Sequence, residues 1–169
     1  MAKTRRKKRF CHKFSEKPHR YGQNVTIDYI DMEEDSCKGI EGYNNILTFL
    51  DRATNFRAAE TTKTKDDIET HETLRFIKGA DEWEMLYADN WKSFPYATRM
   101  LGVAYEKSQP GVHHSNGIIE NTNQAIEYDM KATLAAAGLP ACFWTYAAPY
   151  CAFIHNITQD REDGTSPYT

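Results

Sequence analysis

The sequence lacks the cysteine pairs that a disulfide framework or a structural zinc site requires. Its four cysteines, Cys11, Cys37, Cys142 and Cys151, are widely scattered and form no Cys-X-X-Cys pair, so we expect reduced thiols. Long apolar runs are also lacking, which argues against a membrane-spanning helix. No apolar stretch follows the basic amino terminus, as it would in a secretory signal. We therefore expect an intracellular protein without membrane contact.

The length and composition fit a single folded unit. The chain has 169 residues, of which 40% are hydrophobic and 27% are charged. These values are typical of one soluble globular domain with a proper core, and two domains would have little room.

Charge is unevenly divided along the chain. Residues 1–20 hold nine Lys or Arg residues against the single Glu16, whereas residues 21–169 hold twelve against twenty-three acids. The basic run fits contact with nucleic-acid phosphates or a nuclear address, and it equally fits a solvated arm. Its cations are Lys3, Arg5, Arg6, Lys7, Lys8 and Arg9. We expect a disordered basic arm over 1–21, a folded core over 22–158 and a loop-like, truncated tail over 159–169.

Strand-forming residues recur in the first part of the core. Three short runs separated by polar or turn-forming residues, at 25–32, 45–50 and 56–60, predict an antiparallel meander. Thr64 followed by Asp67 resembles a capping box, which predicts a helix from there to Gly79.

The later sequence favours helices. We expect, in order, a strand, a short helix, a loop and two longer helices, at 83–88, 95–103, 107–115, 118–137 and 142–155. A strand that follows a crossover helix lies parallel to its neighbour. The sequence therefore predicts an α/β fold with a mixed sheet flanked by helices.

Three carboxylates stand at the end or edge of apolar runs. They are Asp28 after Thr26-Ile27, Asp89 after Leu86-Tyr87-Ala88, and Glu120 after Ile118-Ile119. An acid is costly there unless a cation or a reaction needs it. Open α/β sheets place their sites at the carboxyl ends of strands, so the three acids can converge. Hard cations such as Mg²⁺ prefer oxygen ligands, and two of them can clamp the attacking and leaving oxygens of a phosphoryl transfer.

Other residues compete for these roles. Asp31 is a rival first ligand, but strand alternation puts Asp28 and Asp31 on opposite faces, and we favour Asp28. Asp51 also follows an apolar strand, although Asp51-Arg-Ala-Thr-Asn is ordinary turn chemistry. His113 and His114 lie in a predicted loop, where we expect them to be solvated.

The three tryptophans are candidates for stacking on bases. Aromatic residues more often fill cores, so we expect Trp83 and Trp144 to be buried. For Trp91, just past the second acid, the sequence does not decide between a core position and stacking on bases.

The residues around the acids resemble the catalytic blocks of a known family. Thr26-Ile27-Asp28, Tyr87-Ala88-Asp89-Asn90 and Ser115-Asn116-Gly117-Ile118-Ile119-Glu120-Asn121 are similar, in the correct order, to the three blocks of the retroviral and retrotransposon integrase core. The segment from Gly138 to Trp144 resembles the following helical region of the copia-type branch, and Ser166-Pro167-Tyr168 resembles its closing segment. The resemblance covers about residues 20–169.

The resemblance implies a ribonuclease-H-like fold and a DDE polynucleotidyl transferase that uses Mg²⁺ or Mn²⁺. Such an enzyme trims the 3′ ends of element DNA and joins them to target DNA. Asp28, Asp89 and Glu120 would be the catalytic metal ligands. Asn116 and Gly117 would belong to a mobile loop that approaches DNA, with glycine allowing close contact. Integrases act as multimers, so a homo-oligomer is also implied.

Some positions depart from the family pattern. Asp89 and Glu120 are thirty-one positions apart, closer than is typical, and Trp91 stands where many members have Gly. Asn121 replaces a basic residue that usually follows the third acid, and the next helical turn offers Gln124 and Glu127 rather than Lys. Phosphate binding along that helix is therefore expected to be weak.

The departures keep two other functions open. Of the amino-terminal zinc module of the family only Cys11 and His12 remain, and one cysteine cannot make that site, so zinc is not expected. A decayed or co-opted relative would keep the fold and serve as a nucleic-acid or protein interaction module. A ribonuclease-H-type nuclease would share the fold and metals but would cut RNA in a hybrid.

Overall fold

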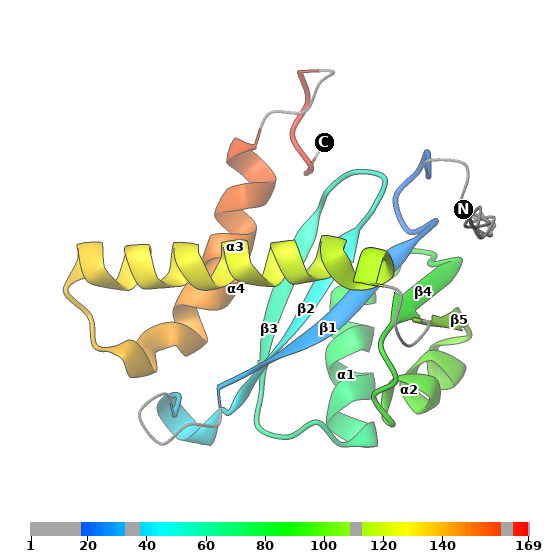
Figure 1. The fold of residues 1–169 in the computed structure, drawn as a ribbon. Helices are drawn as coiled ribbons and strands as arrows, with labels where there is room; N and C mark the ends of the chain where they lie inside the picture. The colour runs from blue at the N-terminus through cyan, green and yellow to red at the C-terminus, as the bar shows by residue number, and fades with distance from the viewer. Residues whose placement is uncertain (1–17, 33–37, 109–112, 160–163, 169) are drawn as a thin grey trace, which may run out of the picture.

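The fold is described by a computed structural model for residues 18–32, 38–108, 113–159 and 164–168, and for 113–116 by the backbone alone (Figure 1). The cations of the predicted arm at positions 3–9 lie outside the described residues, as do residues 33–37 of the predicted polar turn. No helix in the described part is both long and apolar enough to cross a membrane.

Three antiparallel strands open the fold, as the sequence predicts. They are β1 (Val25–Asp31), β2 (Asn45–Asp51) and β3 (Arg57–Thr62), paired in chain order. The turn between β2 and β3 is held by Asp51, whose carboxylate accepts the N–H groups of Gly22, Ala53 and Thr54 at 2.9, 3.1 and 2.7 Å. The interpretation of Asp51 as a turn residue is thus confirmed, since its two oxygens are occupied by backbone donors.

Helix α1 (Asp67–Lys78) follows, but the predicted cap was wrong. Asp66 is the N-cap, and its carboxylate accepts the N–H groups of Ile68 and Glu69. Thr64 lies two residues before the cap, where its hydroxyl bonds the Asp66 and Glu69 carboxylates at 2.6 Å. A carboxylate accepts from helix N–H groups as well as a hydroxyl does, so Asp66, two residues closer to the helix than Thr64, takes the cap position.

The second half of the sheet is parallel. β4 (Met85–Ala88) lies beside β1, with Val25 opposite Leu86 and Ile27 opposite Ala88. Helix α2 (Phe94–Leu101) then leads to β5 (Ala104–Lys107), which pairs parallel to β4. The sequence did not predict β5, because its four residues are half-buried or exposed and show no apolar alternation.

Two long helices complete the chain, and their starts differ from the prediction. α3 (His113–Ala137) begins five residues before the expected Ile118, so residues 113–115 are helical and not part of a loop. α4 (Trp144–Thr158) follows a single 3-10 turn at Ala141–Phe143, and a second 3-10 turn lies at Ile40–Gly42. The loop assignment failed because it was drawn from Pro110 and Gly111, which lie in the undescribed stretch just before α3.

Within the described residues the sheet has five strands in the order β3-β2-β1-β4-β5, and each face carries its own core. One core joins alternate residues of β1 and β2 to α1 and α2, including Ile27, Phe49 and Phe94. The other joins Ile30 and Ile46 to α3 and α4, which cross the opposite face (Figure 1). The predicted mixed sheet flanked by helices is confirmed, and Asp28 belongs to the α3 face.

Candidate active site

Asp28 lies in the middle of β1 and faces α3. Its Oδ2 accepts the side-chain amide of Asn123 at 2.9 Å, and its Oδ1 accepts the N–H of Tyr29 at 2.8 Å. The Thr48 hydroxyl on β2 donates to the Asn123 amide oxygen at 2.7 Å. Asn123 therefore fixes α3 against both β1 and β2 at the level of the acid.

Asn123 is a site residue that sequence reasoning missed. It is 8% exposed, and it lies three positions after Glu120 on α3. Residues three apart share one face of a helix, so the spacing from Glu120 was the signal that would have found it.

Asp89 follows β4 directly. The parallel register, in which Ile27 lies opposite Ala88, continues by one step to place Asp28 beside Asp89. The Asp89 Oδ1 accepts the N–H of Trp91 at 3.0 Å, and its backbone carbonyl accepts the Tyr105 hydroxyl at 2.6 Å. The turn after β4 is thus held by the Asp89 side chain and by Tyr105 of β5.

The charges of the other two acids act on Asp28. Burial raises the pKa of Asp28 to about 6; the N–H of Tyr29 and the amide of Asn123 oppose this, while the charges of Asp89 and Glu120 add to it. Glu120 is exposed on the second turn of α3. The charges of Asp89 and Glu120 thus both reach Asp28, which is the most buried of the three predicted acids.

The donor set suits a hard divalent cation. All three groups are carboxylates, and negative charge concentrated around the half-buried Asp28 is the kind of environment that a cation relieves. Each Asp28 oxygen accepts one hydrogen bond and keeps a further lone pair. In the described part of the chain, no three His, Cys, Asp or Glu side chains are close enough to form one metal-binding group.

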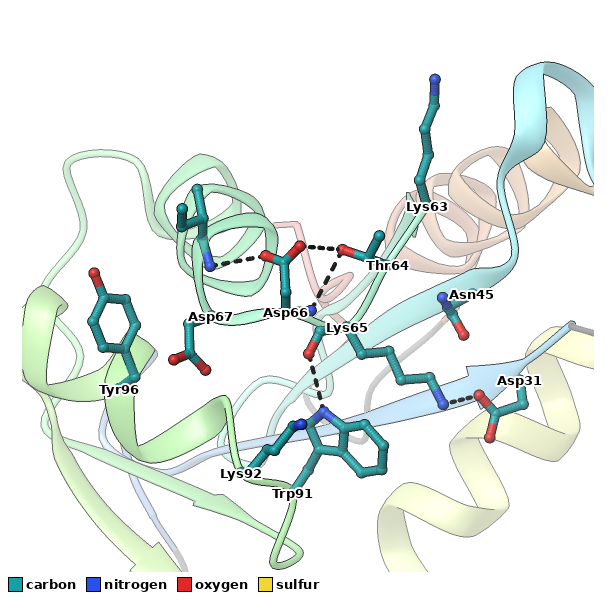
Figure 2. Close-up of a pocket in the computed structure, with 11 residues that line it drawn as sticks. Asp31, Asn45, Lys63, Thr64, Lys65, Asp66, Asp67, Trp91, Lys92 and Tyr96 are labelled. Atoms are coloured by element: carbon teal, nitrogen blue, oxygen red, sulfur yellow. Dashed lines mark hydrogen bonds and ion pairs between the residues drawn. The ribbon is translucent and has the colours of Figure 1, made fainter.

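Asp31 lies on the other face of β1, as alternation predicts. It is exposed and makes an ion pair with Lys65. It lines a cavity of about 1010 Å³ together with residues from the end of β3, the start of α1 and the turn after β4 (Figure 2).

The other predicted residues have different outcomes. Trp83 and Trp144 are buried, which confirms the core interpretation for both. Trp91 is 37% exposed and lines the cavity. The side chains of His113, His114 and Asn116 lie outside the described residues. Gly117 lies within α3, so its place in a loop was wrong, and a Cβ there would meet nothing within 4 Å.

The fold is similar to a solved retroviral structure. A chain of the simian T-cell lymphotropic virus intasome in complex with the PP2A regulatory subunit B56 gamma matches with a TM-score of 0.72 at 14% sequence identity. The match covers 90% of this chain and 55% of that chain. The fold is therefore the ribonuclease-H-like fold of integrases.

A sequence relative points in the same direction. The chain is 26% identical over 124 residues to the retrovirus-related Pol polyprotein from transposon TNT 1-94 of Nicotiana tabacum. The aligned part is 68% of this chain but only 9% of that polyprotein. No protein-family model matches the chain. The chain is thus similar in fold to a chain of a retroviral intasome and distantly similar in sequence to part of a retrotransposon Pol polyprotein.

Proposed function

We propose that the chain is the catalytic core of a retroelement integrase, which processes the 3′ ends of element DNA and transfers them into target DNA. The observation that carries this proposal is the half-buried Asp28 on β1, whose pKa is raised first by burial and further by the charges of Asp89, after β4, and Glu120, on α3. A concentration of acid charge costs free energy, and a cation-dependent reaction is the best reason to keep it.

The three acids are the residues that would hold Mg²⁺ or Mn²⁺. When bound, a pair of such ions activates the attacking hydroxyl and stabilises charge on the leaving oxygen. Asn123 orients the Asp28 carboxylate from α3, and the N–H of Trp91 orients that of Asp89. These hydrogen bonds fix the direction of the oxygen lone pairs before substrate arrives.

The proposed substrate is DNA, which the chain would contact in two places. The basic run at positions 3–9 offers cations to phosphates. Asn116 and Gly117 lie in α3 one turn before Glu120, so DNA that reaches the acids would pass the start of this helix.

The proposed core extends over residues 22–158, as one part of a longer retroelement polyprotein. Support at its start comes from Gly22, whose N–H is held by Asp51. Beyond its end, the N–H of Tyr168 donates to the Asn156 carbonyl of α4 at 3.1 Å. At least the closing segment of the tail is therefore in contact with the core.

Strand transfer of a labelled DNA end into plasmid, with Mg²⁺ or Mn²⁺, tests the enzyme. The intact chain is expected to give metal-dependent joined products, and Asp89→Asn is expected to abolish them. Asp81→Asn is the matched control, because it removes the same charge from an exposed position between α1 and β4. Absence of any metal-dependent product from the intact chain would contradict the enzymatic proposal. Cleavage of an RNA–DNA hybrid without joining would favour the nuclease.

A second candidate is an interaction module with the same fold. The observation that favours it is the surface of α3 after the third acid, where Asn121 and Gln124 are exposed and Glu127 pairs with Lys131 at 3.5 Å. This surface offers phosphates little net attraction. An intact, folded chain that binds DNA or protein without joining DNA would support this candidate.

A further inference from the structure

One lysine occupies an unusual position on the Asp31 face of the sheet. Lys65 lies between β3 and α1 and lines the cavity shown in Figure 2. Its side chain is only 12% exposed, although an ammonium group is costly to remove from water. A buried lysine needs compensating partners, and the identity of those partners indicates its role.

Three groups surround the Lys65 ammonium. It makes an ion pair with Asp31, and it lies 5.4 Å from the centre of the Tyr29 ring and 4.9 Å from the centre of the Trp91 ring. Both distances are within the range of cation–π attraction. The two rings also meet edge to face, with 6.5 Å between their centres. Lys65 thus joins the end of β1 to the turn after β4.

Each of the two rings belongs to a residue that holds one of the acids. The N–H of Tyr29 donates to Asp28, and the N–H of Trp91 donates to Asp89. The indole N–H of Trp91 also donates to the backbone carbonyl of Lys65 at 3.2 Å. The same lysine is therefore connected, through one aromatic residue in each case, to both acids of the adjacent strands.

We propose that Lys65 is a positioning residue for Asp89: by holding the indole of Trp91, it fixes the backbone N–H that orients the Asp89 carboxylate. This inference rests on the proposed function. The N–H of Tyr29 is fixed by strand β1 itself, and the Tyr29 ring also contacts Phe94 and Thr70. The pKa of Lys65 is lowered by burial and raised by the charges of Asp28 and Asp89, so both acids lie within electrostatic reach of the ammonium group.

The positioning role and a simple charge effect predict opposite results. If Lys65 acted only as a nearby positive charge, its removal would strengthen binding of a divalent cation by the acids. If Lys65 orients Asp89, its removal weakens that binding, because a misoriented ligand loses affinity. The sign of the change in Mn²⁺ affinity therefore separates the two roles.

The experiment is calorimetric titration of Mn²⁺ into the full chain and its variants. Lys65→Met and Trp91→Leu are expected to weaken Mn²⁺ binding roughly tenfold. Lys65→Arg keeps the charge and the attraction to aromatic rings, so it should restore binding to within about twofold. Lys63→Met is the matched control: Lys63 lines the same cavity, but the ring beside its ammonium is that of Tyr43, 5.2 Å away.

A second measurement needs no metal. Hydrogen–deuterium exchange across residues 88–92 should be faster in Lys65→Met and in Trp91→Leu than in the unmodified chain, and unchanged in Lys63→Met. Trp91 is partly exposed, so Trp91→Leu is expected to fold. The same measurement can then be made on this variant if Lys65→Met does not fold.

The outcomes separate this inference from the proposed function. If the unmodified chain binds Mn²⁺ and Asp89→Asn abolishes that binding, unchanged or tighter binding in the folded Lys65→Met and Trp91→Leu variants overturns the positioning role alone. Unchanged exchange at 88–92 in these variants does the same. If the unmodified chain shows no Mn²⁺ binding that depends on Asp89, both the function and this inference fail.

Discussion

At the scale of single residues, Asp28 combines two opposing requirements. Its carboxylate is held by Tyr29 and Asn123, which favours the charged form, yet burial and the neighbouring acids raise its pKa to about 6. The unfavourable contributions are larger. Asp28 therefore lowers the stability of the metal-free protein at neutral pH, as expected of a group kept for function.

The substitution Asp28→Asn removes a pH-dependent cost, so the stability of this variant relative to the unmodified metal-free protein should rise by about 1 to 3 kcal/mol between about pH 4 and pH 7.5. The folded pKa of about 6 lies above the unfolded value near 3.9, so the folded state binds the proton more tightly. The cost of Asp28 is absent below about pH 4, grows as pH rises and is complete above the folded pKa. Urea unfolding in the presence of EDTA at several pH values measures the free energy of unfolding of both proteins.

The control for this prediction is Asp81→Asn, which removes the same charge from an exposed position between α1 and β4. The free energy of unfolding of this variant, relative to that of the unmodified chain, should not rise with pH. A pH-independent difference between Asp28→Asn and the unmodified chain would contradict the assigned cause.

At the scale of elements, the sequence predicted the strands, turns and helix ends that depend on residues close together in the chain. The three strands of the meander follow from apolar runs and from the Asp51 turn, and α1 ends at Gly79 as expected. The acids were found because each stands next to such a run. The α1 cap was displaced to Asp66 because two oxygens compete for the same N–H groups, and sequence alone does not rank them.

Elements stabilised by tertiary contacts could not be predicted. β5 exists because β4 offers it hydrogen bonds in parallel register, with Met85 opposite Ala104. Asn123 belongs to the candidate site because Thr48 on β2 and Asp28 on β1 both make hydrogen bonds with it. Neither relation leaves a periodic pattern in the chain, since each depends on residues that are distant in sequence.

The helical position of Gly117 leads to a second prediction. Gly117→Ala should stabilise the protein by about 0.5 to 1 kcal/mol, since glycine is a poor helix former and an added Cβ would meet nothing within 4 Å. If DNA passes close to this turn of α3, the same methyl group should weaken binding of a DNA end. Thermal unfolding and fluorescence anisotropy measure the two effects.

Gly138→Ala is the matched control for Gly117→Ala. An added Cβ at Gly138 would also meet nothing within 4 Å, but its φ of +67° disfavours any side chain. This variant should lose about 1 kcal/mol through backbone strain. Equal stability changes at the two glycines would contradict the helical assignment of Gly117.

At the scale of the whole molecule, opposite charges are separated between the arm and the core. If the basic run makes most phosphate contacts, replacing Lys3, Arg5, Arg6, Lys7, Lys8 and Arg9 by Gln should reduce the slope of log K against log salt by about 3 to 5. Lys131→Gln, on the exposed surface of α3, should leave the slope nearly unchanged. DNA binding measured between about 50 and 200 mM salt tests this. An unchanged slope in the arm variant would place the phosphate contacts on the core.

The pairing of β1 with β4 also has a consequence for the order of folding. The hairpins β1–β2 and β2–β3 join residues close in sequence, whereas Asp28 and Asp89 are brought together only when a segment containing β2, β3 and α1 has closed. Contacts between distant residues form later, because loop closure costs entropy first. We expect the meander to fold early and the acid pair to meet last, so their repulsion should slow the final step of folding.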